Sequence, residues 1–340
     1  MELQERLAGY LSAKLGSDVR VTAFARKSGG ASRETYLFDA TWEEAGRTVE
    51  RGYVLRRDPV ASVLESDRTL EFRVLEAAYA LGIPAPKVSF LELSAAPLER
   101  PFFIMERVDG MPTPPTFPAG YPLEMRARTA ADFVTILAQI HGADWRSQQL
   151  DFLDDPGPGT AAARQAVAHW HAIYQQDRLE PHPILERAFG WLERHLPATD
   201  GTTMVHGDYR SGNYLHDNDG HITAMLDWEM AHFGDPHEDL GWATMPYWSC
   251  EGRAAGLEHE DEMLLRYERA SGRVVDRASV RFYQVLGTVK MAAISLTGVR
   301  SYCDGRSAEP TLPVVGLLLG RLSIELLALM GVAATPAEAR

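Results

Sequence analysis

The chain has 340 residues, of which 45% are hydrophobic and 24% charged, the ordinary balance of a globular protein with room for one large domain or two smaller ones. Its formal net charge of −13, with a pI near 5.3, argues against nucleic acid or anionic lipid as the main partner, because phosphate groups are bound by basic patches. An acidic surface suits a cationic substrate, but it also keeps a protein in solution, and we expect the second reason to dominate.

The first hundred residues are expected to be mainly β-structure after an amphipathic helix at residues 1–16. Segments rich in aromatic and β-branched residues predict four strands: 35–42, 52–56, 87–93 and 102–106. A polar turn at 43–47 joins the first two. Between the second and third, the spacing of apolar residues predicts a helix over 66–81, which the Gly- and Pro-rich segment 82–86 ends.

A Pro-rich stretch at 109–115 marks the expected connection between two lobes. Beyond it the helical period of apolar residues predicts six helices: 123–143, 160–176, 182–195, 256–271, 276–297 and 313–330. One short β-like segment, 222–227, interrupts them. We therefore expect an α+β fold with a small β-rich lobe over residues 1–107 and a larger, mainly helical lobe over residues 108–340.

The cellular setting is indicated by the cysteines and by the ends of the chain. Cys250 and Cys303 lie far apart without metal-type spacing, which favours a reducing cytoplasm over a disulfide framework. Charges mixed through residues 1–16 are unlike a signal peptide. The apolar run from Val314 to Leu319 is soon followed by charged residues, so we expect no membrane span. The expectation is a soluble, cytoplasmic protein.

Chemistry is concentrated in residues 205–213 and 225–229. Phosphoryl transfer needs a group that orients the attacking hydroxyl and hard oxygen ligands for a metal that holds phosphate. Asp208, on a Gly-flanked loop, can face a hydroxyl. Asn213, five residues on, and Asp227, after a separate short strand, can offer oxygens to Mg²⁺. Arg210 lies between them and can neutralise charge on the group in transfer.

The motifs HGDYRSGN, LDWE and GDPHEDL, in this order, resemble the aminoglycoside phosphotransferase family, the small-molecule branch of the protein-kinase-like fold. The resemblance implies a two-lobed kinase-like fold, Asp208 as catalytic base, and Asn213 and Asp227 as Mg²⁺ ligands. It also implies that Asp235 and Asp239 are structural carboxylates that brace the catalytic loop. His206 is expected to brace the loop rather than to move protons.

A zinc site is the alternative for the histidine-rich part of the chain. Five histidines lie close together in sequence: His206, His216, His221, His232 and His237. No pair of them has the helical spacing that zinc hydrolases use, with a neighbouring glutamate. The sequence therefore favours the phosphotransferase over a metal hydrolase.

The N-terminal half is expected to bind ATP. The segment SGGASRETY joins two strand-like segments, and the small residues Gly29, Gly30 and Ser32 would let backbone N–H groups approach phosphates. Alone this is typical of any hairpin loop. It is similar, however, to the phosphate loop of the aminoglycoside phosphotransferases, and that resemblance assigns it to nucleotide binding.

Arg56 takes the position that a lysine holds in the general kinase pattern. An arginine keeps a permanent charge and a planar fork, so phosphate binding with altered geometry is expected. Arg57 is the alternative, although strand alternation turns it to the opposite face. Glu71, on the following helix, is the expected ion-pair partner of Arg56.

The segment FFIMERV matches the hinge between kinase lobes, where backbone groups of Glu106 and Val108 are expected to read adenine. In the C-terminal half, His141 is expected to be structural. Three aromatic residues after GDPHEDL are more typical of a core, with an acceptor-binding pocket as the alternative: Trp242, Tyr247 and Trp248.

The predicted function is transfer of the terminal phosphate of ATP, with Mg²⁺, to an alcohol of a small molecule. The segments RSGGASRETY, VLRRDP, EFRVLEA and LDWEMAHFGDP are similar to the branch found beside or fused to acyl-CoA dehydrogenases, which implies a hydroxyacyl acceptor, free or as its CoA thioester. The sequence leaves open a choice between ATP and GTP and does not indicate an oligomeric state.

Three other functions are weighed. An aminoglycoside or other antibiotic kinase would use acidic residues to receive ammonium groups: Glu251, Glu258, Glu260, Asp261 and Glu262. A non-catalytic pseudokinase is suggested only by the arginine at position 56. A protein kinase is disfavoured because DFG and APE motifs are missing and the segment from Asp227 to Asp239 is too short to seat a peptide.

Overall fold

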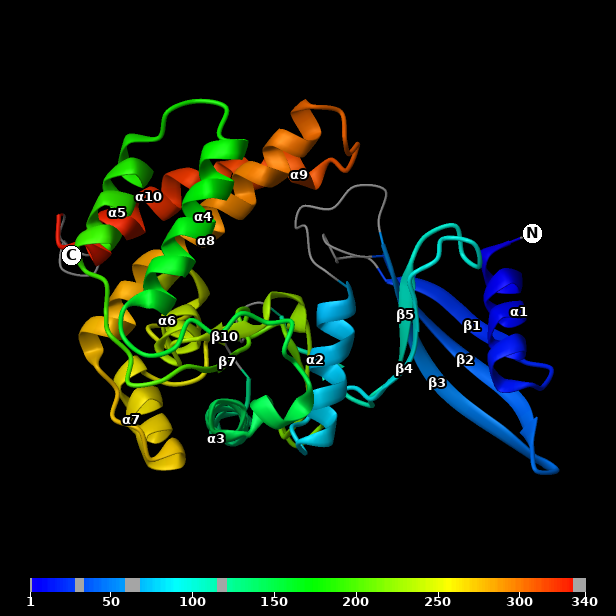
Figure 1. Ribbon diagram of the computed structural model, residues 1–340. Coiled ribbons are helices and arrows are strands. Elements are labelled where there is room, and N and C mark those ends of the chain that lie inside the picture. The colour runs from blue at the N-terminus through cyan, green and yellow to red at the C-terminus, as the bar shows by residue number, and fades with distance from the viewer. Residues whose placement is uncertain (1, 28–33, 59–67, 115–120, 333–340) are drawn as a thin grey trace.

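The N-terminal part is a five-stranded antiparallel sheet with the strand order β1-β2-β3-β5-β4 (Figure 1). The structure, a computed structural model, describes residues 2–27, 34–58, 68–114 and 121–332. The strands are β1 (Arg20–Lys27), β2 (Glu34–Glu44), β3 (Arg47–Arg57), β4 (Val88–Glu92) and β5 (Phe102–Glu106). The helices of this part are α1 (Leu3–Leu15) and α2 (Arg68–Ala80).

The β2–β3 hairpin is longer than expected and is closed by a two-residue turn. Glu44 pairs with Arg47, and the two residues between them, Ala45 and Gly46, have φ of 50° and 74°. Two positive φ values in succession match the right-handed twist of the paired strands. The predicted turn is confirmed, and pairing in register carries Arg56 to the far end of β3, opposite Thr35.

Strand β5 separates two hydrophobic cores. Phe102 and Ile104 pack with α1 and the outer face of the sheet, whereas Phe103 and Met105 pack with α2 and the C-terminal part. This alternation follows from the two-residue period of a strand. In Figure 1, α2 lies between the sheet and the helical part, so both faces of the sheet are covered near β5.

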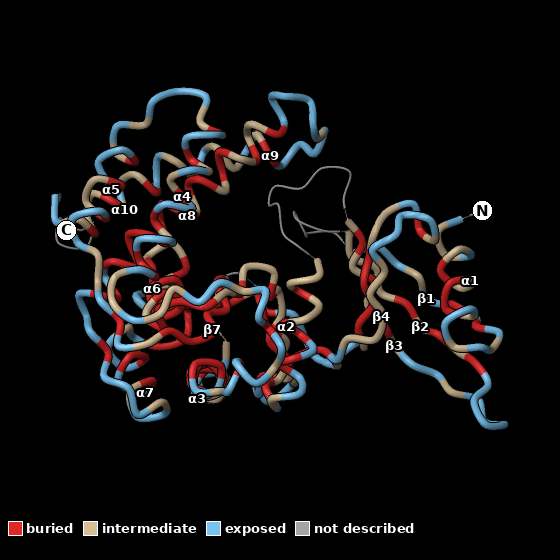
Figure 2. The backbone as a smooth tube through the Cα atoms, viewed as in Figure 1, coloured by how far each residue is buried: buried red, intermediate tan, exposed pale blue. Residues whose placement is uncertain are grey.

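The C-terminal part is mainly helical (Figures 1 and 2). Its α-helices are α3 (Leu123–Gly142), α4 (Ala161–Asp177), α5 (Pro183–Arg194), α6 (His237–Thr244), α7 (Glu260–Ser271), α8 (Arg277–Cys303), α9 (Thr311–Val314) and α10 (Leu318–Leu329). Its 3₁₀ turns are η1 (Trp145–Gln148), η2 (Trp228–Met230), η3 (Pro246–Trp248) and η4 (Val315–Leu317). The α+β class and the protein-kinase-like arrangement expected from the sequence are confirmed.

Short strands carry the polar motifs. They are β6 (Met111–Pro112), β7 (Thr203–Val205), β8 (Tyr214–His216), β9 (Ile222–Met225) and β10 (His232–Gly234). Strand β9 pairs with β8, which pairs with β6, and β10 pairs with β7. Of these only β9 was expected, because strands of two to four residues are too short to show a period of two.

Helix α8 is the central helix of the C-terminal part, and α4, α5, α6 and α10 pack against it. Its contact with α6 is especially close: a Cβ added to Gly241 would lie 2.5 Å from the Cβ of Tyr283. Only glycine permits this approach. The helix predicted at 276–297 is confirmed, although the helix in the structure, α8, is longer than the predicted one. Helix α6, which begins within GDPHEDL, was not expected.

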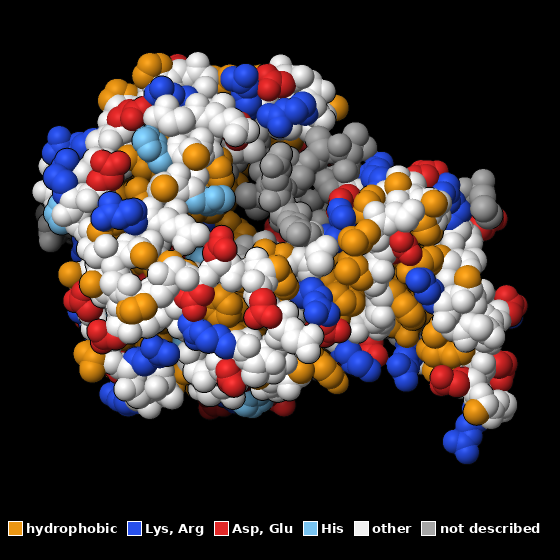
Figure 3. All heavy atoms as spheres, viewed as in Figure 1, with side chains coloured by type: hydrophobic (Ala, Val, Ile, Leu, Met, Phe, Trp, Pro, Cys, Tyr) orange, Lys and Arg blue, Asp and Glu red, His pale blue; other side chains and the backbone are white. Residues whose placement is uncertain are grey.

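One described segment, Thr311–Leu329, is long and apolar enough to cross a membrane by length and composition alone, although 22% of it is buried. We expected Arg321 and Glu325 to end the apolar run, but both lie within this segment, where they pair at 2.8 Å along α10. Leu322, Leu326 and Leu329 of the same helix pack into the core with α8 and α5. On the face drawn in Figure 3, acidic and basic side chains are interspersed.

Candidate active site

The loop from His206 to Asn213 connects β7 to β8 and carries the predicted catalytic residues. Its second residue, Gly207, has a φ of 82°, and a Cβ there would lie 2.4 Å from the backbone oxygen of Met230. No other residue fits without moving the backbone. Gly207 is therefore needed for the chain to run close to η2, and this path positions the next residue, Asp208.

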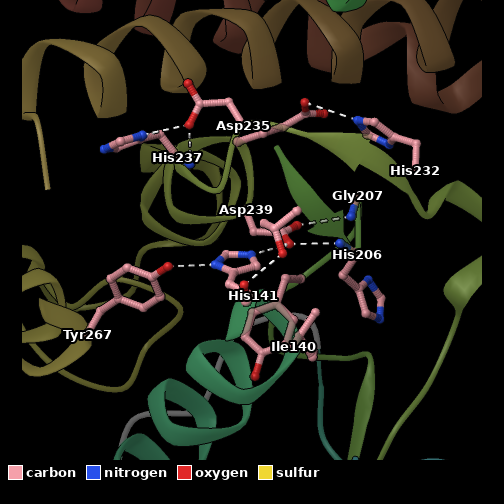
Figure 4. A network of polar contacts seen from close by, with 12 residues as sticks. Ile140, His141, His206, Gly207, His232, Asp235, His237, Asp239 and Tyr267 are labelled. Atoms are coloured by element: carbon pink, nitrogen blue, oxygen red, sulfur yellow. Dashed lines mark hydrogen bonds and ion pairs between the residues drawn. The ribbon is translucent and has the colours of Figure 1, made fainter. Parts of the chain in front are cut away.

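A buried carboxylate, Asp239 of α6, anchors the start of this loop (Figure 4). It accepts hydrogen bonds from the N–H groups of His206 (2.7 Å) and Gly207 (2.9 Å) and from His141 Nε2 (3.1 Å). Since a carboxylate only accepts, His141 Nδ1 accepts in turn from the Tyr267 hydroxyl at 2.7 Å. Burial alone would raise the pKa of Asp239, but the hydrogen bond from His141 and the loop N–H groups lower it. The bracing role expected for Asp239 and the structural role of His141 are confirmed.

His206 is a brace and is fully bonded. Its Nδ1 accepts from the N–H of Asp208 at 3.2 Å, so its Nε2 carries the proton and donates to Leu226 O at 3.0 Å. Burial lowers the pKa of His206, which keeps the ring neutral. Both ring nitrogens are used inside the fold, and neither faces a substrate, as expected.

Asp208 is oriented by three side-chain donors. Its Oδ1 accepts from Arg210 Nε at 2.9 Å and from Trp242 Nε1 at 2.8 Å, and its Oδ2 accepts from Asn213 Nδ2 at 2.5 Å. The side chain is 16% exposed. A carboxylate held in one orientation at a partly open position is the arrangement that a general base requires.

Arg210 was expected to neutralise charge on the group in transfer. The structure shows it bonded to Asp208 and to Ser211 O, with its guanidinium 4.6 Å from the ring centre of Trp248. It therefore also orients the carboxylate of Asp208. Its contact with a phosphate stays a prediction.

Asn213 and Asp227 leave adjoining ends of β8 and β9, and the N–H of Leu226 donates to Asn213 O at 2.8 Å. The side-chain amide nitrogen of Asn213 is turned toward Asp208. The side-chain carbonyl oxygen of Asn213 therefore lies on the side away from Asp208. Asp227 has left-handed φ and ψ of 62° and 57° that re-aim its carboxylate at the end of the strand. A side-chain amide oxygen and a carboxylate on neighbouring strand ends are the kind of hard oxygen ligands that Mg²⁺ takes, and Mg²⁺ completes its shell with phosphate oxygens and water.

Zinc is a poor match for this region. Among the described residues no group of three or more His, Cys, Asp or Glu side chains is placed to hold a metal ion. His232 instead pairs with Glu238 at 3.2 Å, and His237 pairs with Asp235 at 2.6 Å (Figure 4). These contacts confirm that Asp235 is structural.

Arg56 reaches from β3 to the predicted partner, Glu71, and to a second carboxylate, Asp227, that was not predicted as its partner. Its Nη2 lies 3.5 Å from Glu71 of α2, and its Nη1 donates to Asp227 at 2.8 Å. Burial would lower the pKa of Arg56, but Glu71 and Asp227 raise it, and Arg56 in turn lowers the pKa of Asp227. The Arg56–Glu71 pair is confirmed. Arg57 turns to the other face, where it pairs with Glu34 at 3.2 Å.

The remaining nucleotide-binding residues are placed less fully. Gly29, Gly30 and Ser32 lie outside the described residues. The N–H groups of Glu106 and Arg107 bond to Lys87 O and Gly52 O within the sheet, so Glu106 could offer adenine only its carbonyl. Val108 lies two residues after the end of β5 and is half-buried, and its role stays a prediction.

Two residues next to Asp208 were not recognised from the sequence as part of the site. Trp242 was weighed as core or acceptor pocket, yet its indole nitrogen bonds the carboxylate itself. Lys290 was not considered, although a single lysine in the apolar run from Val285 to Ile294 was a signal. Its ammonium donates to the carbonyl oxygen of Gly207.

This loop, brace and carboxylate arrangement can be compared with known proteins. A model of the phosphotransferase enzyme family matches residues 24–283, which is most of the chain. The chain belongs to the phosphotransferase enzyme family. The resemblance seen in HGDYRSGN and GDPHEDL is confirmed.

Curated relatives of this phosphotransferase are longer proteins. It is 30% identical over 250 residues to mouse acyl-CoA dehydrogenase family member 10. The aligned residues cover 72% of this chain and 22% of the mouse protein. It is 29% identical over 304 residues to acyl-CoA dehydrogenase family member 11 of Pongo abelii, 82% of this chain and 38% of that protein. The chain thus spans between a fifth and two-fifths of these relatives.

Solved structures share the fold of this phosphotransferase. A proposed aminoglycoside phosphotransferase from Ralstonia eutropha JMP134 superposes with a TM-score of 0.73 at 22% identity, covering 97% of this chain and 99% of that one. A macrolide 2'-phosphotransferase type I gives 0.59 at 19% identity, over 93% and 96%. A thermostable mutant of aminoglycoside phosphotransferase APH(4)-Ia, in complex with AMP-PNP and hygromycin B, gives 0.58 at 20% identity, over 97% and 99%.

Proposed function

We propose that this phosphotransferase moves the terminal phosphate of ATP to the hydroxyl of a hydroxyacyl compound, free or as its CoA thioester. Asp208 is the general base, Asn213 and Asp227 hold Mg²⁺, and Arg56, paired with Glu71, contacts the phosphates. The observation that carries the proposal is the convergence of Asp208, Asn213 and Asp227 at one end of the β8–β9 hairpin.

The transfer step follows from the position of Asp208. The acceptor hydroxyl gives its proton to the carboxylate while its oxygen bonds to the terminal phosphorus of ATP. The bond from that phosphorus to the bridging oxygen breaks, and ADP leaves with the electron pair. The donors on Asp208 hold the carboxylate in one orientation, so that little reorganisation is needed at the moment of transfer.

The metal would be held by the carbonyl oxygen of Asn213 and the carboxylate of Asp227. When bound, Mg²⁺ neutralises phosphate charge that builds up during transfer. Arg56 now occupies one oxygen of Asp227 at 2.8 Å, so nucleotide binding would have to redirect its guanidinium toward phosphate. Glu71, 1% exposed, would keep Arg56 in the cleft during that exchange.

The acceptor is proposed from the curated relatives that are named as acyl-CoA dehydrogenases. Their identity of 26–30% over 250 residues or more is higher than the 19–20% of the two antibiotic-modifying fold neighbours. A kinase sharing a chain with such an enzyme has an acyl compound as its natural substrate. Arg210 beside Asp208 also suits an acceptor with a carboxylate or a CoA phosphate better than a polycation.

An antibiotic kinase is the second candidate, because two fold neighbours carry such names. At least three of the five acidic residues that would receive an aminoglycoside are already engaged, however. Glu258 pairs with Arg266 at 3.0 Å, Asp261 with Arg277 at 3.0 Å, and Glu260 accepts from Gln284 at 3.1 Å. These contacts favour the anionic acceptor.

The test is ATP turnover by the purified chain with Mg²⁺ and a panel of 4-hydroxyacids, their CoA thioesters, aminoglycosides and macrolides, with products identified by ³¹P NMR. Turnover with the acyl compounds is expected, and Asp208→Asn should lower kcat by roughly 10²–10⁴-fold. The control is Asp219→Ala, an exposed acid at the far end of the same hairpin. Turnover confined to antibiotics would select the second candidate, and ATP binding without any turnover would indicate a pseudokinase.

A further inference from the structure

Lys290, in the middle of α8, is a buried cation that the proposed chemistry does not use. Lys290 is 3% exposed. The close partners of its ammonium are the carbonyl oxygen of Gly207 and two indole rings, with centroids 4.4 Å away for Trp242 and 5.4 Å for Trp170. A lysine is almost never fully buried without a reason, because removing its charge from water is costly.

Trp242 connects this cation to the catalytic carboxylate. One face of its ring lies against the ammonium of Lys290, and its Nε1 donates to Asp208 Oδ1 at 2.8 Å. The contact exists because Gly241, the preceding residue, lets α6 approach α8 closely. The same ammonium holds Gly207, the residue directly before Asp208, through its carbonyl oxygen.

We propose that Lys290 and Trp242 form a positioning pair that fixes both the backbone and the carboxylate of the catalytic aspartate, Asp208. The inference rests on the proposed function, in which Asp208 is the base. It also identifies the reacting oxygen. Among the described residues, Oδ1 accepts from Trp242 and Arg210, whereas Oδ2 accepts from Asn213 alone, so Oδ2 is the atom that takes the hydroxyl proton.

The electrostatics around Lys290 agree with a positioning role. Burial lowers the pKa of Lys290, while Glu238, Asp208 and Asp239 raise it and Arg210 lowers it. Indole faces and a carbonyl oxygen stabilise an ammonium without neutralising it. The charge can therefore polarise the indole N–H toward Asp208, which a methionine of similar size would not do.

The experiment compares Trp242→Phe, which removes the N–H but keeps a ring face, with Lys290→Met, which removes the charge and keeps the length. The matched control is Trp170→Phe, since Trp170 contacts Lys290 but not Asp208. The two site variants should each lower kcat by about 10–100-fold, with KM for ATP within about 3-fold of wild type. The double variant should lose little more than the worse single variant, because the two residues act as one unit. Trp170→Phe should stay within about 3-fold.

A second readout does not depend on turnover. In protein labelled with ¹⁵N-tryptophan, the indole resonance missing from Trp242→Phe belongs to Trp242. The chemical shift of this Trp242 indole resonance should change in Lys290→Met and in Asp208→Ala, and it should be unchanged in Trp170→Phe. An unmoved resonance in Lys290→Met, kcat losses that simply add, or an effect confined to KM would overturn the positioning pair. If the resonance moves but wild type phosphorylates no alcohol, the pair stands and the proposed function fails.

Discussion

The side chain at position 56 has a task that a lysine performs differently. Arg56 uses two nitrogens of one planar group to reach Asp227 and Glu71 from opposite sides of the cleft. An ammonium is a single point charge on a flexible stem and cannot hold both carboxylates with the same fixed geometry. The arginine therefore couples the sheet, α2 and the end of β9 through one side chain.

Arg56→Met should raise KM for ATP by roughly 10–100-fold, because a hydrogen bond to a charged group contributes about 1.5–3 kcal/mol. The KM of Arg56→Lys for ATP should lie between those of Arg56→Met and wild type, because lysine keeps the charge but lacks the planar guanidinium group. The measurement is initial-rate kinetics over a range of ATP concentrations. Arg57→Met, on the opposite face of the same strand, is the control. Equal KM values for the two methionine variants would remove Arg56 from the nucleotide site.

At the scale of elements, the catalytic loop is held by three neighbours that are distant in sequence. Asp239 of α6 binds the first two N–H groups of the loop, Leu226 at the end of β9 accepts from the side chain of His206, and Lys290 of α8 binds the carbonyl oxygen of Gly207. A loop with this many buried polar contacts is rigid before any ligand arrives. The stability of the loop and the aim of Asp208 are therefore set by the same bonds.

His206 should make the fold sensitive to acid. Its pKa is lowered in the folded state by burial, so between its unfolded pKa, about 6.5, and the lower folded value the unfolded chain binds more protons. The free energy of unfolding then falls as pH falls through this window, by up to about 1.4 kcal/mol per pH unit from this residue.

The check is urea unfolding of wild type and His206→Gln between pH 7.5 and 5. The difference in unfolding free energy between the two proteins should shrink as pH falls, because only wild type has this histidine to protonate. His232, whose pKa is raised by its pairing with Glu238 although burial opposes this, is present in both proteins and cancels in the difference. A difference that is constant with pH would mean that His206 is not held neutral.

At the scale of the whole molecule, the sheet and the helical part meet along β5, α2 and the Arg56–Asp227 ion pair. The proposed Mg²⁺ ligands lie on the helical part, and the proposed nucleotide contacts lie mostly on the sheet. A metal-bound nucleotide would therefore connect the two parts, and its binding energy would add to the stability of the folded chain.

Mg²⁺ with the non-hydrolysable analogue AMP-PNP should raise the melting temperature of wild type, by an amount that corresponds to about 2.7 kcal/mol at a hundredfold excess over Kd. The part of this rise that requires Mg²⁺ should vanish in Asp227→Ala and persist in Asp219→Ala. Differential scanning calorimetry with AMP-PNP, with and without Mg²⁺, measures both parts. A full Mg²⁺-dependent shift in Asp227→Ala would exclude Asp227 as a metal ligand.

Much of this protein could be predicted from local sequence. Strand alternation separated Arg56 from Arg57, and helical periodicity located the long helices of the C-terminal part. The order of the HGDYRSGN, LDWE and GDPHEDL motifs identified the family, because phosphoryl transfer constrains a few residue types at fixed spacing. These signals act over a few residues and need no knowledge of the fold.

Other features depended on contacts between distant segments. Three contacts could not be predicted from sequence spacing, because 34, 83 and 171 residues separate the partners. They are the hydrogen bond from Trp242 to Asp208, the hydrogen bond from Lys290 to the Gly207 carbonyl, and the ion pair of Arg56 with Asp227. The sequence by itself determined the fold class and the family, and it named the residues that we propose carry the chemistry. Only the tertiary structure decided how the base is aimed, because its orientation is set by side chains that α6, α8 and β3 bring together after the chain has folded.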